Sequence, residues 1–149
     1  KHPCLALESF AEAAPKDACL IIVGAGNELA HLKQLAAKLG VDERVFFEGE
    51  EDSAPYYHLA DVLLVTSRYE GYGLVIVEAL ASGVPVLSTD VGAARELGAR
   101  VVSEAEYANA LKTFFKGEHR AGSLDSYPYE DFESYVHAYC EDIRSAIKR

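Results

Sequence analysis

The chain has 149 residues and half of them are hydrophobic, which predicts one folded domain over residues 1–149 with a substantial core and excludes a disordered chain. Its net charge of −10 argues against nucleic acid or an anionic bilayer as the main partner. No apolar run approaches the ~20 residues of a membrane span and no charged-then-apolar leader is recognisable, so we expect a cytoplasmic protein without a transmembrane segment. The three cysteines lack metal-ligand spacing, and we expect them to be reduced, buried thiols.

The first half of the chain alternates helical and strand patterns. Apolar residues recur at helical spacing as far as Ala14, and Pro15 then ends the pattern. Short apolar runs bounded by polar or glycine residues predict strands. In chain order, the sequence predicts a helix at residues 1–14, a strand at 19–23, a helix that begins at an Asn27 N-cap and ends at Gly40, a strand at 45–47, and a short helix or turn within 52–59.

The second half continues this alternation. The predicted elements are a strand at 62–66, a helix at 74–82 that is stopped by Gly83 and Pro85, a strand at 85–88, a short helix at 93–97, a strand at 100–102, a helix at 104–115 and a loop at 116–126. The strand runs do not alternate polar with apolar residues, as expected where helices cover both faces of a sheet. The fold class is therefore predicted as α/β with a doubly wound, Rossmann-like parallel sheet.

Residues 127–149 have a different character and predict a C-terminal helix. One apolar stripe runs along this helix and is formed by Phe132, Tyr135, Val136, Tyr139, Ile143 and Ile147. The plain interpretation of the stripe is a face that packs on the core.

The most informative segment is the glycine-containing turn between the predicted strand at 62–66 and the helix that follows it. Gly71 and Gly73 let a ligand approach the backbone closely, and the first amides of a helix attract anions. Glu78 lies one turn beyond Leu74 on the same helix face, and Glu70 stands just before the turn. Since carboxylates accept hydrogen bonds from hydroxyls, an anion site between two carboxylates suits a nucleotide-sugar, in which a diphosphate separates two polyols.

These residues carry a resemblance to a known family. Glu70 and Glu78 resemble the E-x7-E motif of retaining glycosyltransferases of the glycogen-synthase-like group, the glycosyltransferase family 4 type. The resemblance is specific because the motif lies within a longer run of matching segments, Glu70-Gly71-Tyr72-Gly73-Leu74, Glu78-Ala79-Leu80-Ala81, Gly83-Val84-Pro85-Val86 and Gly92-Ala93-Ala94-Arg95-Glu96. There are two departures, since Tyr72 replaces the commonest phenylalanine and Ala93 stands where the family often has a second glycine.

The resemblance implies the donor-binding, C-terminal half of a GT-B fold. A missing N-terminal domain would bind the acceptor, and the end of the helix at 127–149 would contact that domain. The donor would be a UDP-, GDP- or ADP-sugar, with no cofactor and no metal. The isolated chain would be inactive, and the full-length protein could associate peripherally with a membrane.

The resemblance also implies roles for individual residues. It assigns Glu78 to the ribose hydroxyls, Glu70 to the transferred sugar, and the amides of Gly73 and Leu74 to the phosphates. Gly71 and Tyr72 complete the predicted substrate-binding turn. No residue is predicted to act as a nucleophile.

Three alternatives stay open at this point. Lys1 matches a lysine that binds the donor diphosphate in the family. The alternative is that Lys1 is an ordinary flexible surface residue at a chain end. Gly24-Ala25-Gly26, with Glu48 at the end of the next strand, fits part of the dinucleotide-binding fingerprint of an oxidoreductase, although Leu29 holds the third glycine position. A stand-alone, non-catalytic nucleotide-sugar-binding module would carry the same turn and carboxylates.

Overall fold

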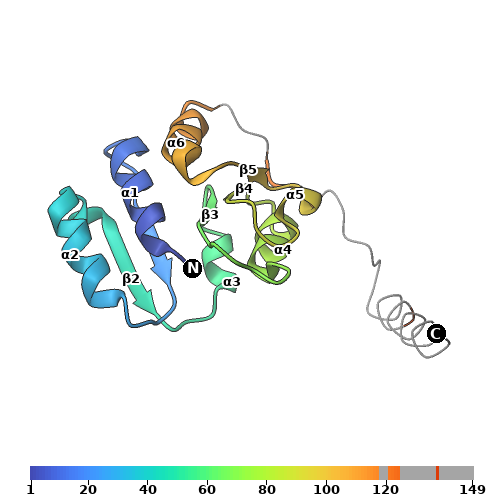
Figure 1. Cartoon of the computed structure of the whole chain (residues 1–149), viewed down its shortest axis with the longest axis horizontal. Helices are drawn as coiled ribbons and strands as arrows, with labels where there is room; N and C mark the ends of the chain where they lie inside the picture. Colours follow the sequence, from blue (N-terminus) through green and yellow to red (C-terminus); the bar gives the residue numbers. More distant parts are fainter. Residues whose placement is uncertain (118–120, 125–136, 138–149) are drawn as a thin grey trace.

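A computed structural model describes residues 1–117, 121–124 and 137 (Figure 1). The helices and strands, in chain order, are α1 (Pro3–Ala13), β1 (Leu20–Val23), α2 (Leu29–Leu39), η1 (Asp42–Arg44), β2 (Val45–Gly49), α3 (Ala54–Tyr57), β3 (Leu63–Val65), α4 (Leu74–Ala81), β4 (Val86–Ser88), α5 (Ala94–Leu97), β5 (Arg100–Val101), η2 (Glu104–Glu106) and α6 (Tyr107–Phe115). None of the helices in these described ranges is long and apolar enough to cross a membrane. Apart from residue 137, the predicted helix at 127–149 lies outside the described residues.

The strands pair only in parallel, and they form two hydrogen-bonded groups. β1 pairs with β2, with Ile21 opposite Phe46. β3 pairs with β4, with Leu64 opposite Leu87, and β4 pairs in turn with β5. Within the described part of the chain no ladder joins one group to the other. The two groups are therefore held together by other contacts.

Helices cover the strands on two sides, as the continuous apolar runs predict. Leu87 of β4 packs in one cluster with Tyr107 and Leu111 of α6. Its neighbour Val86 packs in a different cluster with Ile76 of α4. Because successive side chains of a strand point to opposite faces, α6 lies on one face of β4 and α4 lies on the other. The fold class is α/β with parallel strands, which is consistent with the Rossmann-like prediction.

Helix α1 joins the two strand groups. Leu7 and Phe10 belong to a core cluster with α2 and with residues of β1 and β2. Leu5 packs instead against the cluster that contains Tyr107 of α6. In Figure 1, α1 lies between β2 on one side and β3 and α6 on the other. The helix ends at Ala14, whose extended backbone precedes Pro15, as expected for a residue before proline.

Over residues 1–117, the structure confirms the order and type of the predicted elements, with some differences at their ends. Helix α2 has Glu28 at its N-cap rather than Asn27, and no side chain caps it. The predicted helix at 104–115 is divided into η2 and α6, because the Ser103 hydroxyl and the Glu106 carboxylate form a capping box around a tight first turn. The sequence pattern does not predict η1.

The prediction of buried thiols is wrong for Cys19, and Cys140 lies outside the described residues. Cys19 is exposed and directly precedes the first residue of β1. Cys4 is half-buried near the start of α1. Both thiols are free.

A truncation of Leu7 tests the role of α1. Leu7 is fully buried, so we expect Leu7→Ala to lower the free energy of unfolding by about 2–5 kcal/mol, as for other large-to-small changes in a core. Chemical denaturation of wild type and variant measures this loss. Glu8→Ala, an exposed position on the same helix, is the control and should change the free energy of unfolding by less than about 0.5 kcal/mol. A similar effect of both substitutions would contradict this account of α1.

Candidate functional site

The turn between β3 and α4 presents the start of a helix without a side-chain cap. Gly73 occupies the N-cap with φ 93° and ψ 56°, a left-handed conformation that favours glycine. The first hydrogen bond of the helix runs from the Ile76 amide to the Gly73 carbonyl at 2.9 Å. The amides of Leu74 and Val75 precede it and have no acceptor within the helix. These amides and the positive end of the helix are suited to an anion.

The loop after β4 fixes the path of this turn. The Ala93 amide donates a hydrogen bond to the Tyr72 carbonyl at 3.1 Å. Gly92 has φ 52°, and a Cβ atom at this position would lie 2.6 Å from the same carbonyl oxygen. Only a residue without a side chain lets the two loops approach so closely. Gly71 has no positive φ and open space around its Cβ position, so the turn does not require glycine there.

The carboxylate of Glu70 is held by two other segments of the chain. The Ser67 hydroxyl donates to Glu70 Oε1 at 2.7 Å, and Lys1 Nζ donates to the same oxygen. The side chain of Glu70 is only 14% exposed, whereas that of Lys1 is 70% exposed. Partial burial by itself would raise the pKa of Glu70, but the hydrogen bonds from Lys1 and Ser67 and the charge of Lys1 outweigh it and lower the pKa of this carboxyl.

Lys1 reaches Glu70 because the first residues of the chain are attached to the end of β3. The hydroxyl of Thr66, which follows β3, donates to the His2 carbonyl at 3.0 Å and to the Lys1 carbonyl at 3.3 Å. Thr66 is buried. The structure therefore brings two predicted site residues, Lys1 and Glu70, which are 69 positions apart in the sequence, into direct contact.

Glu78 lies on an exposed face of α4, one turn beyond Leu74. Leu74 is 67% exposed, so this face of the helix is open to a ligand. The Tyr57 hydroxyl of α3 donates to Glu78 Oε2 at 2.8 Å. Burial is the main reason why the pKa of Tyr57 is raised, to about 12, and its hydrogen bond to Glu78 raises the pKa further, against a hydrogen bond from Ser53 that lowers it. Tyr57 therefore remains a hydrogen-bond donor at neutral pH.

The sequence analysis did not predict the roles of three residues at this site. These are Ser67, which binds Glu70, Tyr57, which binds Glu78, and Gly92, which contacts Tyr72. Ser67 follows β3 directly and stands three residues before Glu70, which is a detectable local signal. Tyr57 and Gly92 act on residues about twenty positions away in the sequence, where no spacing rule applies.

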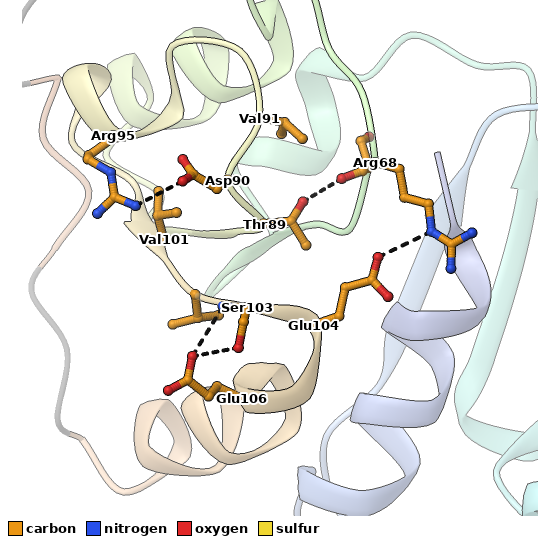
Figure 2. A pocket seen from close by; sticks show the side chains of 11 residues that line it. Arg68, Thr89, Asp90, Val91, Arg95, Val101, Ser103, Glu104 and Glu106 are labelled. Atoms are coloured by element: carbon orange, nitrogen blue, oxygen red, sulfur yellow. Dashed lines mark hydrogen bonds and ion pairs between the residues drawn. The ribbon is translucent and has the colours of Figure 1, made fainter.

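A pocket of about 450 Å³ adjoins the site at the carboxyl ends of β3, β4 and β5 (Figure 2). Ser67, which holds Glu70, is part of its lining. Figure 2 shows two ion pairs in this pocket, Arg68 with Glu104 at 3.2 Å and Arg95 with Asp90 at 3.2 Å. Both arginines are mostly exposed, as expected for surface arginines. The carboxyl ends of parallel strands are the edge where α/β sheets bind ligands.

The second glycine-containing turn, at residues 24–26, follows the end of β1. The Gly24 amide donates to the Gly49 carbonyl, which links the ends of β1 and β2. Leu29, at the third position of the dinucleotide fingerprint, is the first residue of α2 and is 40% exposed. In the ranges that the structure describes, no group of three or more His, Cys, Asp or Glu residues is placed to hold a metal ion.

Residues 1–116 match the family model "Glycosyl transferases group 1". Among curated proteins, the chain is 45% identical over 69 residues to the lipopolysaccharide core biosynthesis mannosyltransferase LpsB of Rhizobium meliloti, a match that covers 46% of this chain and 20% of that protein. It is 38% identical over 93 residues to N-acetyl-alpha-D-glucosaminyl L-malate synthase of Bacillus anthracis, covering 61% of this chain and 24% of that protein. The chain thus spans a quarter or less of the length of these relatives.

Solved structures share the fold. HepE of Anabaena in complex with UDP and glucose superposes with a TM-score of 0.73 at 27% identity, covering 85% of this chain and 38% of that one. Sucrose-phosphate synthase from Thermosynechococcus elongatus superposes with a TM-score of 0.75 at 24% identity, covering 97% of this chain and 42% of that one. The second likeness shows the fold alone.

Substitution of Gly92 tests the contact between the two loops. We expect Gly92→Ala to lower the free energy of unfolding by about 1–3 kcal/mol, because the new Cβ would meet the Tyr72 carbonyl and the left-handed backbone would be strained. Gly71→Ala is the matched control in the partner loop and should cost little, since its Cβ would point into open space. Urea denaturation of both variants measures the difference, and equal losses would contradict this account of the turn.

The pH dependence of stability tests the contacts of Glu70. Because the pKa of Glu70 is lowered in the folded protein, its stabilising effect is present above the usual carboxyl range and is lost as the pH falls through the folded-state pKa. We expect the difference in free energy of unfolding between wild type and Glu70→Gln to be largest near neutral pH and to shrink toward about pH 3. Denaturant titrations at several pH values measure it. A difference that stays constant across this range would show that the ionised carboxylate contributes nothing.

Proposed function

Because this chain belongs to the glycosyl transferases group 1 family, we propose that it is the donor-binding part of a retaining glycosyltransferase that uses a nucleotide-diphospho-sugar. The observation that carries the proposal is the uncapped start of α4 between the carboxylates of Glu70 and Glu78. It offers one anion site and two groups that accept hydrogen bonds from hydroxyls. A diphosphate with a ribose on one side and a sugar on the other fits this order of groups.

The proposed roles follow from the position of each group. The amides of Gly73 and Leu74 bind the diphosphate, with Gly71 and Tyr72 completing the turn around it. Glu78 accepts hydrogen bonds from the ribose hydroxyls. Glu70 accepts hydrogen bonds from the sugar that is transferred.

The chemical contribution of the turn is electrostatic. When the bond between the sugar and the diphosphate breaks, negative charge develops on the departing diphosphate. Amides that already point at this position stabilise the charge without having to reorganise. Lys1 adds a positive charge close to the same place, because it is held on Glu70. The acceptor attacks from the face that the leaving group vacates, and this step requires no nucleophile from the protein.

The comparisons support the donor class but do not distinguish the base. HepE, at 27% identity, has been solved with UDP-glucose and with UDP and glucose. Other relatives are named as mannosyltransferases, and two of them are described as GDP-mannose-dependent. We therefore propose a UDP-, GDP- or ADP-sugar as donor. The names of these relatives as glycosyltransferases argue against the dinucleotide-dependent oxidoreductase alternative.

We further propose that the chain acts together with an N-terminal, acceptor-binding domain. The relatives named above are four to five times longer than the matched region, which covers 20% and 24% of them. The free thiols of Cys4 and Cys19 suit a reducing compartment, and we place the protein in the cytoplasm. An assay of sugar transfer by the full-length protein and by the 149-residue chain tests the need for the partner domain.

The proposed ribose contact predicts the effect of removing the Glu78 carboxylate. We expect Glu78→Ala to weaken nucleotide binding by about tenfold or more, because a hydrogen bond to a charged group is lost in the bound state. Isothermal titration calorimetry with UDP, GDP and ADP measures the affinity and identifies the base. Glu12→Ala, an exposed glutamate on α1, is the control and should bind as wild type does. Unchanged affinity in a folded Glu78→Ala variant would refute the ribose role.

A further inference from the structure

Tyr57 combines a buried ring with a hydroxyl that points to the candidate site. The residue is 8% exposed, and its ring belongs to the core cluster with Ile76 and Ala79 of α4. Its hydroxyl donates to Glu78 Oε2 at 2.8 Å, although Glu78 itself lies on an exposed face of α4. The ring is thus fixed by apolar packing, while the hydroxyl acts on a carboxylate that faces the solvent.

We propose that Tyr57 is a positioning residue that holds the Glu78 carboxylate in the orientation in which it accepts hydrogen bonds from the ribose of the donor. This inference rests on the proposed function, because it assigns a role through the ribose contact of Glu78. It adds to the site a residue from α3, which lies outside the motif that contains Glu70 and Glu78.

The physical basis is the loss of side-chain freedom before the ligand arrives. A glutamate on an exposed helix face samples several rotamers, and ordering such a side chain on binding costs free energy. Tyr57 occupies Oε2 of Glu78 and leaves Oε1 for a ligand hydroxyl. Since the ring of Tyr57 is held in the core, the orientation is set by the fold rather than by the ligand.

The direction of the hydrogen bond is also fixed. With its pKa raised to about 12, Tyr57 keeps its proton throughout the neutral range. A phenol that keeps its proton donates to Oε2 of the carboxylate, so Oε1 remains as the acceptor for a ribose hydroxyl.

The test compares two nucleotides in the natural full-length protein and uses Tyr57→Phe, which keeps the ring and removes only the hydroxyl. The probes are UDP and 2′,3′-dideoxy-UDP, or the same pair with the base that wild type binds. We expect Tyr57→Phe to weaken UDP binding by about tenfold and to leave the binding of the dideoxy compound unchanged, because that compound has no ribose hydroxyls for Glu78 to contact. In a Glu78→Ala background, Tyr57→Phe should have no further effect.

A matched control separates positioning from packing. Tyr107 is also a buried tyrosine of the core, and its hydroxyl donates to the Leu87 carbonyl at 2.6 Å. Tyr107→Phe makes the same chemical change away from the site, so we expect it to lower the melting temperature and to leave both affinities unchanged.

The outcomes distinguish this inference from the proposed function. If Glu78→Ala loses UDP binding but Tyr57→Phe does not, the positioning role is overturned and the proposed function stands. An equal loss of both nucleotides in Tyr57→Phe would show a purely structural role and would also overturn the inference. If wild type binds no nucleotide, or if Glu78→Ala binds as well as wild type, the ribose contact itself fails and the inference fails with it.

Discussion

The packing of α1 is the constraint on which the rest of the structure depends. The described strands form two parallel groups without a ladder between them, so main-chain hydrogen bonds do not hold the halves together. Helix α1 packs on α2 through Leu7 and Phe10 and on the α6 side through Leu5. Hydrophobic burial on two sides of one helix therefore joins the groups. Lys1, which contacts Glu70, lies just before this helix and is bound to Thr66, so the core and the candidate site meet at the start of α1.

The candidate site is assembled from segments that are far apart in the sequence and close in space. The turn before α4 supplies the amides, the loop after β4 fixes the Tyr72 carbonyl, and α3 supplies the hydroxyl that contacts Glu78. Each of these segments begins at the end of a parallel strand or lies on a connection between two strands. A parallel sheet brings such ends to one edge, which explains how short contacts arise between distant residues.

Much of this organisation could be predicted from the sequence. Helical spacing and apolar runs predict the order of the elements, and two glycines before a helix predict the uncapped helix start at Gly73. The contact of Tyr57 with Glu78 could not be predicted, because it depends on how α3 packs against α4 and no spacing rule relates the two residues. The separation into two strand groups was equally inaccessible, since an apolar run predicts a strand but does not name its neighbour. Cys19 was predicted to be buried and is exposed, because apolar neighbours in the sequence do not ensure burial.

The contact between the loops at Gly92 and Tyr72 has a consequence for variation at this site. The Ala93 amide binds the main-chain carbonyl of Tyr72, and the close approach at Gly92 involves the same carbonyl. The Tyr72 side chain is 40% exposed and takes no part in either contact. The path of the turn is thus independent of which aromatic ring residue 72 carries, so this tyrosine can stand in place of phenylalanine without moving the helix amides. The backbone contact therefore allows either tyrosine or phenylalanine at position 72 but requires glycine at position 92.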